Sequence, residues 1–250
     1  MDLSLVNTGL LLAVLAAISL GALLKGMTGL GLPLFAVPAL AVITSVEEAV
    51  VLMVFPSLGS NLWLVVSHRQ YRHLLREHLP FLLSGFVGGF LGTGILLLVS
   101  DRGLKLLLAI WLGLYLVSYF LKPAALALFG ANRKAGLPLG LAAGTIQGAT
   151  GISAQVVAPY FHARGLVREA YAFAVAFTFL LFTIAQFTAM ANTDLLTPER
   201  VKLSLLALVP ALLFTRVGIS LSGRISVTVF NRILLAVFVA MELKLIVDIF

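Results

Sequence analysis

The 250-residue sequence contains no cysteine and few charged residues. Without cysteine the chain can form neither a disulfide scaffold nor a thiolate metal site. Only 11% of the residues are charged, whereas 61% are hydrophobic. A soluble domain carries roughly a quarter charged residues because its surface must face water. The polar residues here could not cover a globule, so we expect an integral membrane protein whose exterior is solvated largely by lipid.

Several catalytic and binding motifs are also missing. There is no Walker-type loop, so we expect no ATP hydrolysis. The segment from Gly151 to Gln155 starts like a nucleophile elbow but lacks the final glycine, and no His and Asp partners are evident at membrane depth. His68, His73 and His78 recur every five residues, which is not the spacing of a helical metal pair and is expected of a solvated loop. We therefore expect no enzyme activity, no metal and no cofactor.

Ten apolar segments follow one another along the chain, in two sets of five. A basic stretch that includes Lys122, Arg133 and Lys134 separates the sets, and residues 123–134 are the predicted cytoplasmic linker. A spanning helix needs about 20 mostly apolar residues. Three segments are much shorter and border glycine-containing breaks, so they are candidates for re-entrant or broken helices. The segments are 5–24, 30–44, 48–66, 79–99, 104–121, 136–147, 152–162, 169–190, 203–222 and 229–249, of which 30–44, 136–147 and 152–162 are the short ones.

The two sets of segments repeat the same sequence features in the same order. The most distinctive is Lys25-Gly26-Met27-Thr28-Gly29-Leu30, which matches Gln147-Gly148-Ala149-Thr150-Gly151-Ile152. Since five traverses are an odd number, the second repeat should be inverted relative to the first. We predict an all-α membrane fold of two inverted-topology repeats, residues 1–122 and 135–250, with broken or re-entrant Gly-rich hairpins that meet near the midplane. The other matched features are Val37-Pro38 with Ala158-Pro159, Glu47-Glu48 with Arg168-Glu169, Pro80 and Gly88 with Pro210 and Gly218, and 105–109 with 232–236.

The distribution of basic residues predicts the orientation of these segments. If the loop 67–79 is cytoplasmic, the inverted arrangement also places the linker, the turn with Arg164 and Arg168, and Arg224 on the inner side. Most basic residues then lie inside, as the positive-inside rule requires, while the acidic turn at residues 47–48 and both termini lie outside. The formal charge of +7 is therefore a topology signal. Because the basic residues are scattered, we expect no nucleic-acid partner.

The two Gly/Thr breaks are the predicted substrate site, because transporters with inverted repeats bind substrates where broken helices meet. The threonines are expected N-caps of the helices that follow, and the glycines leave backbone N–H groups accessible. Such helix N-termini favour anions. In the alternative, the glycines only allow close helix packing. The predicted substrate-binding residues at the breaks are Lys25, Gly26, Thr28, Gly29, Gln147, Gly148, Thr150, Gly151 and Gln155.

Two cations could serve this site. A lysine at the bilayer centre costs about 2.5–3.5 kcal/mol on insertion scales, so Lys25 is either functional or marks the cytoplasmic end of its helix. Both interpretations of Lys25 stay open. Arg216 lies well inside the segment 203–222, and we expect it to face inward, where it would contact the anion or bond to backbone carbonyls. Polar residues on the third helix of each half, such as Asn61 and Gln186, are expected to bond to neighbouring helices.

The repeated motif, followed by Val37-Pro38 in one half and Ala158-Pro159 in the other, resembles the sulfite exporter TauE/SafE family of membrane permeases. The resemblance covers nearly the whole chain, although both breaks have fewer consecutive glycines than the usual pattern. It implies export or uptake of sulfite, organosulfonates or related sulfur-containing anions in a bacterial inner membrane. The expected partners are this anion, the lipid bilayer, a coupling proton or cation, and a second copy of the chain in a homodimer.

The residues by themselves indicate a membrane transporter of an anion. With the resemblance, we expect a secondary transporter that exports sulfite or an organosulfonate by alternating access around the two breaks. Two alternatives stay open, an anion channel with the same fold and a non-transporting scaffold subunit of a membrane complex.

Overall fold

The computed structural model describes residues 8–29, 32–121, 135–191, 193–222 and 227–249, and their side chains except at 118–121 and 227–234. These residues form helices joined by short turns and contain no strand, which confirms the all-α prediction for this part of the chain. The predicted linker 123–134, with Lys122 before it, and Arg224 lie outside the described residues. The helices are α1 (Thr8–Thr28), α2 (Leu32–Ile43), α3 (Val46–Leu52), α4 (Val54–Ser67), the 3-10 helix η2 (Arg69–Tyr71), α5 (Leu74–Glu77), α6 (Leu79–Leu98), α7 (Asp101–Leu121), α9 (Gly136–Thr150), α10 (Ala154–His162), α11 (Arg168–Met190), α12 (Pro198–Leu221) and α13 (Val227–Ile249).

The lengths of these helices follow the predicted segments. The helices α2, α9 and α10 have only 12, 15 and 9 residues, whereas a helix that spans the membrane needs about 20. At a rise of about 1.5 Å per residue, none of the three is long enough to cross a hydrocarbon core of about 30 Å by itself. Whether they turn back inside the bilayer stays a prediction. The helices long and apolar enough to cross a membrane, among the described residues, are Thr8–Thr28, Val46–Ser67 (α3 with α4), Leu79–Leu98, Arg168–Met190 and Pro198–Leu221.

Large apolar side chains are exposed on the long helices α1, α6 and α13. Leu12, Leu98 and Val247 are 62%, 88% and 70% exposed. Burying such side chains against hydrocarbon is favourable, whereas leaving so many of them in water is not. The exterior of the described chain is therefore suited to lipid, as its composition predicts.

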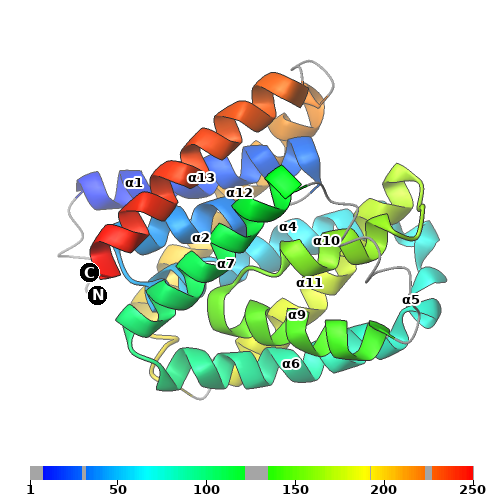
Figure 1. The fold of residues 1–250 in the computed structure, drawn as a ribbon, viewed down its shortest axis with the longest axis horizontal. Coiled ribbons are helices and arrows are strands. Elements are labelled where there is room, and N and C mark those ends of the chain that lie inside the picture. The colour runs from blue at the N-terminus through cyan, green and yellow to red at the C-terminus, as the bar shows by residue number, and fades with distance from the viewer. Residues whose placement is uncertain (1–7, 30–31, 122–134, 192, 223–226, 250) are drawn as a thin grey trace. The chain divides into compact units, whose positions relative to one another are not determined.

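The helices gather into two compact units, and each unit takes helices from both halves of the sequence (Figure 1). Unit 1 comprises residues 1–56, 99–121 and 195–250, and unit 2 comprises residues 57–98 and 122–194. The predicted repeats, 1–122 and 135–250, are defined by sequence similarity and membrane orientation rather than by these contacts. The inverted repeat therefore stays a prediction.

In unit 1, α1 packs against α12 through two glycines. A Cβ atom at Gly26 would come within 2.8 Å of the Cα atom of Gly218, so the backbones touch and neither position can carry a side chain without a shift. On another side of the unit, the ring of Phe238 in α13 lies 6.4 Å from Phe35 in α2 and 5.4 Å from Tyr115 in α7. These rings join α2, α7 and α13 into an apolar cluster.

In unit 2, α6 and α9 run side by side with their backbones in contact (Figure 1). A Cβ atom at Gly144 would lie 1.9 Å from the carbonyl oxygen of Gly85, and one at Gly148 would lie 2.4 Å from that of Gly89. With Gly140, the glycines of α9 recur every four residues and so share one face of the helix. This is the small-residue packing typical of membrane helices, and it positions the C-terminal end of α9.

The predicted segment 48–66 is interrupted after Leu52, which a continuous apolar pattern did not reveal. Pro56 has no N–H to donate to the carbonyl of Leu52, and its ring crowds that oxygen. Ser204 of α12 resolves the break, because its Oγ donates to the carbonyl oxygen of Leu52 at 2.8 Å and accepts from the amide nitrogen of Phe55 at 3.3 Å. A side chain from another helix thus replaces the missing intrahelical bond.

Candidate functional site

The second break, between α9 and α10, is formed by Gly151 in the left-handed conformation. Its φ is +73°, and its N–H donates to the carbonyl oxygen of Gln147 at 2.7 Å. A side chain would be strained at this φ, so glycine is the residue that can end α9 here. The chain then enters α10, with Ser153 at the N-cap position. The carbonyl end of one helix and the N–H end of the next therefore lie a few residues apart.

The first break begins with the same geometry. Gly29 has a φ of +76°, and its N–H donates to the carbonyl oxygen of Lys25 at 2.8 Å. A Cβ atom at Gly29 would meet no atom of the described residues within 4 Å, so the backbone conformation is what requires glycine. Residues 30–31 lie outside the described part of the chain. The matched sequence motifs thus correspond to matched local structures at the ends of α1 and α9.

The prediction that Thr28 and Thr150 are N-caps is wrong. They are the last residues of α1 and α9, and their hydroxyls donate back to the carbonyl oxygens of Leu24 and Ile146, both at 2.8 Å. The physical reason is the following glycine, whose left-handed conformation ends each helix directly after the threonine. The N-cap position of α10 consequently falls on Ser153, beyond the motif.

A buried polar network surrounds the second break. Ser153 makes no side-chain cap of α10, and its Oγ donates to the side-chain oxygen of Gln147 at 2.9 Å. The side-chain nitrogen of Gln186 in α11 donates to the carbonyl oxygens of Gln147 and Gly148, both at 3.0 Å. Gln186 therefore satisfies carbonyls at the C-terminal end of α9, while the first turn of α10 has no capping side chain from Ser153. The break thus combines bonded carbonyls at the end of α9 with a start of α10 that Ser153 does not cap.

The packing alternative for the glycines holds at two of the four positions. Gly26 and Gly148 are buried where α1 meets α12 and where α9 meets α6, and a Cβ atom at either would clash with backbone. Gly29 and Gly151 instead supply the positive φ of the breaks. Within each motif, the first glycine thus allows close packing of two helices and the second allows the chain to leave the helix.

The two predicted cations differ in their surroundings. Lys25 is only 3% exposed in the last turn of α1, next to the Gly26 contact. Arg216 is exposed on α12, beside the exposed Val217, whereas its neighbour Thr215 is buried toward α1. The expected inward position of Arg216 is not observed, because the α1-facing stripe of α12 passes through Thr215 and Gly218. Its role toward an anion stays a prediction.

The structure brings together the residues of each break with helices of the same unit. In unit 2, Gln147, Gly148, Thr150 and Gly151 lie with Ser153 and Gln186, and Gln155 is half-buried in the first turn of α10. In unit 1, Lys25 and Gly26 lie against α12. Each break is described within its own unit, so the predicted meeting of the two breaks is untested.

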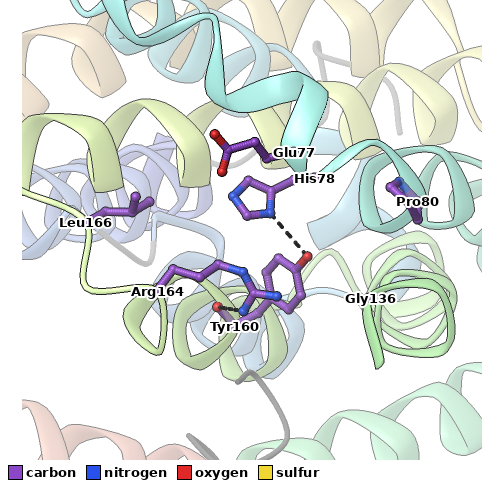
Figure 2. A pocket seen from close by; sticks show the side chains of 7 residues that line it. All are labelled: Glu77, His78, Pro80, Gly136, Tyr160, Arg164 and Leu166. Carbon is purple, nitrogen blue, oxygen red and sulfur yellow. Dashed lines mark hydrogen bonds between the residues drawn. The ribbon is translucent and has the colours of Figure 1, made fainter. Parts of the chain in front are cut away.

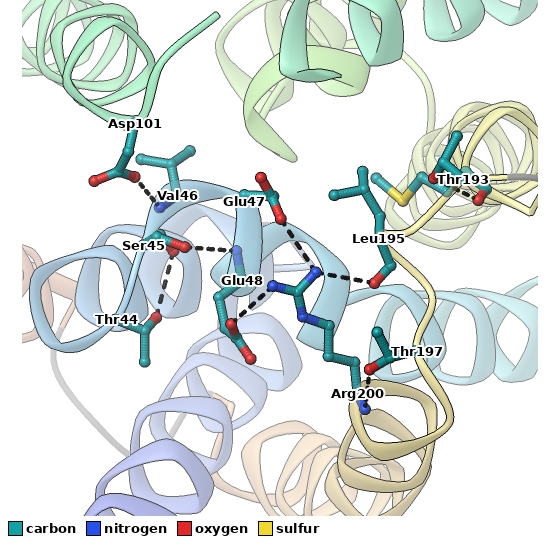
Figure 3. A network of polar contacts seen from close by, with 11 residues as sticks. Thr44, Ser45, Val46, Glu47, Glu48, Asp101, Thr193, Leu195, Thr197 and Arg200 are labelled. Atoms are coloured by element: carbon teal, nitrogen blue, oxygen red, sulfur yellow. Dashed lines mark hydrogen bonds and ion pairs between the residues drawn. The ribbon is translucent and has the colours of Figure 1, made fainter. Parts of the chain in front are cut away.

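The sequence analysis missed a charged cluster in unit 1. Arg200 of α12 lies 3.1 Å from Glu47 and 3.2 Å from Glu48, both in the first turn of α3, and it also donates to the carbonyl oxygen of Leu195 at 3.2 Å (Figure 3). The carboxylate of Asp101 accepts from the amide of Val46 at 2.9 Å and so caps the same helix end. The available signal was the rarity of acidic residues in the chain, which makes two adjacent glutamates notable.

The chain matches a known protein family over most of its length. Residues 13–245 match the model of the family described as sulfite exporter TauE/SafE. No curated protein and no solved structure matches the chain.

Proposed function

Because the chain belongs to the sulfite exporter TauE/SafE family and is thus a multi-pass membrane transporter rather than an enzyme, we propose that it exports sulfite or an organosulfonate across a bacterial inner membrane. The observation that carries this proposal is the second break. There a helix N-terminus that Ser153 leaves uncapped lies beside a buried network of hydrogen-bonding side chains. We further propose that transport proceeds by alternating access, coupled to a proton or another cation.

The chemistry of the second break suits a tetrahedral or pyramidal oxyanion. The N-terminal end of a helix carries a partial positive charge and N–H groups that point at a ligand. The side-chain amide of Gln155 adds a hydrogen-bonding group in the same turn, whereas the O–H of Ser153 is engaged with Gln147. Thr150 has a supporting role, because its hydroxyl is engaged with Ile146 and accepts from the amide of Ile152 at 3.3 Å. We assign it to fixing the shape of the break.

Lys25 supplies the positive charge in this proposal. A lysine that only marked the end of a helix would extend toward water or headgroups, whereas Lys25 is only 3% exposed. Keeping such a side chain inside a membrane protein is costly, which is why intramembrane lysines tend to have a function. The exposed Arg216 has a lesser part, as an electrostatic contribution to the approach of the anion.

Sulfite flux into proteoliposomes tests the proposal. We expect saturable flux for the wild type, a loss of roughly tenfold or more for Lys25→Met, which removes one charged contact, and no change for the exposed control Lys202→Met. Thr150→Val and Thr188→Val form a second matched pair, because both hydroxyls donate to the carbonyl four residues earlier, at 2.8 and 2.7 Å. Only the substitution at the break should lower the flux.

The alternatives make different predictions in the same assay. A channel would give flux that does not saturate, and a scaffold subunit would give none. Absence of flux for sulfite and for a series of organosulfonates would contradict the substrate assignment. Equal flux for Lys25→Met and wild type would remove Lys25 from the site.

A further inference from the structure

Unit 2 contains a cavity of about 380 Å³ at the ends of four helical elements. Its size is within the range of about 300–1,000 Å³ typical of small-molecule pockets. Figure 2 shows residues from the end of α5, the start of α6, the start of α9 and the end of α10 around one space. On the predicted topology this end of unit 2 is cytoplasmic, since it includes the end of the basic loop 67–79 and the turn after α10. The lining residues are Glu77, His78, Pro80, Gly136, Tyr160, Arg164 and Leu166.

Two buried polar side chains form the inner wall of this cavity. His78 and Tyr160 are 6% and 3% exposed, and the Nδ1 atom of His78 lies 3.3 Å from the hydroxyl oxygen of Tyr160 in a hydrogen bond (Figure 2). The ring of Tyr160 stacks on Phe81 with 3.9 Å between centroids, and Phe161 meets His78 edge-on at 5.0 Å. The expectation that His78 lies in a solvated loop is therefore wrong. Its position between α5 and α6 directs its ring toward the aromatic side chains of Tyr160 and Phe161.

Arg164 is held in place at the side of the cavity. Its guanidinium carbon lies 3.7 Å above the centroid of the Tyr160 ring, and one of its nitrogens donates to the backbone carbonyl oxygen of Tyr160 at 2.7 Å. Stacking together with this hydrogen bond restricts a side chain that is otherwise flexible. A planar guanidinium fixed in this way suits a phosphate or sulfonate, which it can contact through two N–H groups.

Glu77 places the opposite charge at the same cavity. In Figure 2, Glu77 and Arg164 come from different elements, with the ring of His78 between them. Gly136 begins α9, and a Cβ atom there would lie 3.4 Å from the hydroxyl oxygen of Tyr160, so a helix N-terminus also lies at the oxyanion side. A purely anionic ligand would be repelled by Glu77, whereas a ligand with an additional ammonium group would use it.

The other half of the sequence lacks this polar set. When the halves are aligned on Pro38 with Pro159 and on Pro80 with Pro210, no polar residue occupies the positions that correspond to the polar lining residues. The matched positions in the other half of the sequence therefore carry no such groups. In the first-half hairpin and in α12, the counterparts of Glu77, His78, Tyr160 and Arg164 are Ala207, Leu208, Ala39 and Ile43.

We propose that this cavity binds a small zwitterion, in which a phosphate or sulfonate oxyanion contacts Arg164 and Tyr160 and an ammonium group contacts Glu77. The probe is phosphoethanolamine, which occurs both as a free compound and as the headgroup of phosphatidylethanolamine. Three apolar residues that are adjacent in sequence to lining residues are exposed, namely Leu79 (45%), Leu137 (57%) and Val167 (61%). Since such side chains can contact lipid tails, they favour the lipid as the source of the headgroup. This site is distinct from the breaks, and its occupancy does not require transport.

Two binding measurements on the purified full chain test the proposal. In detergent, phosphoethanolamine, inorganic phosphate and ethanolamine are titrated by calorimetry. In parallel, lipids retained from vesicles of phosphatidylethanolamine or of phosphatidylglycerol are identified by native mass spectrometry. The variants are Arg164→Gln, Glu77→Gln and Tyr160→Phe, with Arg76→Gln as control, because Arg76 is exposed and does not line the cavity.

We expect phosphoethanolamine to bind with an affinity roughly tenfold or more above that of phosphate or ethanolamine, because each of these two lacks one of the charged contacts. Arg164→Gln should abolish this binding, Glu77→Gln should remove the preference over phosphate, Tyr160→Phe should weaken binding, and Arg76→Gln should change nothing. Retention of phosphatidylethanolamine without binding of free phosphoethanolamine identifies the lipid, and binding of the free compound identifies a soluble ligand. Equal binding of phosphate or phosphatidylglycerol, or binding of neither source, overturns the proposal.

Discussion

The Nη2 atom of Arg200 lies 3.2 Å from the Oε2 atom of Glu48 and joins the start of α12 to the start of α3 (Figure 3). The same guanidinium contacts Glu47, whose side chain is 36% exposed, against 11% for that of Glu48. Within the described chain, Oε1 of Glu48 and Nε of Arg200 are buried and have no hydrogen-bond partner. The favourable contact between Arg200 and Glu48 is therefore offset in part by buried polar atoms that make no hydrogen bond, as is common in buried ion pairs.

Neutralising the two glutamates should have unequal effects on stability. Glu48→Gln leaves a largely buried guanidinium with less compensation, so it should lower the free energy of unfolding by about 2 kcal/mol. Glu47→Gln removes a half-exposed contact and should cost less than about 1 kcal/mol. Thermal unfolding in detergent measures both variants. Equal losses would show that burial does not distinguish the two contacts.

The bond from Ser204 to Leu52 should matter only while Pro56 interrupts the helix. Ser204→Ala leaves a buried carbonyl oxygen without its donor, which should cost about 1–3 kcal/mol. In a Pro56→Ala background the new N–H at position 56 can bond to Leu52, so the cost of Ser204→Ala should be smaller. A double-mutant cycle of unfolding free energies measures this coupling. Additive losses would contradict the explanation of the interruption.

Alanine should have opposite effects at Gly29 and Gly94, where an added Cβ atom would meet no other element of the described chain within 4 Å. Gly29 has a φ of +76°, so Gly29→Ala should destabilise by about 1–2 kcal/mol through backbone strain. Gly94 lies inside α6 without a positive φ, so Gly94→Ala should be neutral or stabilising by up to about 1 kcal/mol. Unfolding measurements on the two variants provide the comparison. A loss at both positions would point to close contacts that this structure does not contain.

Gln186 should support the second break through its amide nitrogen. Gln186→Leu keeps the size of the side chain but leaves the carbonyl oxygens of Gln147 and Gly148 without this donor. Hydrogen–deuterium exchange should then increase locally at the end of α9 and the start of α10, with a loss of stability of about 1–3 kcal/mol. Thr183→Val, which removes a hydroxyl bonded only within α11, is the control. Unchanged exchange at the break would assign Gln186 to general packing.

Sequence alone predicted the class of protein, the long helices and the positions of both breaks, because these depend on apolar length and on glycine. It failed where the backbone conformation of a single residue or a distant side chain decides the local structure. Thr150 was assigned to the wrong helix end, since only the φ of Gly151 shows where α9 stops. The pairing of Arg200 with Glu48 joins residues 152 positions apart, which no local pattern contains.

The failures at Arg216 and His78 have a related cause. Helical periodicity gives the angle between residues but not which face meets a neighbour, so Arg216 could be expected inside and yet be exposed. His78 was grouped with His68 and His73 by spacing, although the start of α6 turns it toward Tyr160. The partners of a side chain depend on tertiary packing, and a single sequence does not supply that information.

The most direct test of the account is sulfite counterflow in proteoliposomes. Vesicles preloaded with unlabelled sulfite should accumulate labelled sulfite transiently above equilibrium, because a carrier that alternates between two faces exchanges one substrate for another. The wild type and Lys202→Met should show this overshoot, and Lys25→Met should lose it. Labelled sulfite that only equilibrates, with or without preloading, would contradict alternating access and indicate a channel, and no uptake at all would contradict transport of sulfite by this chain.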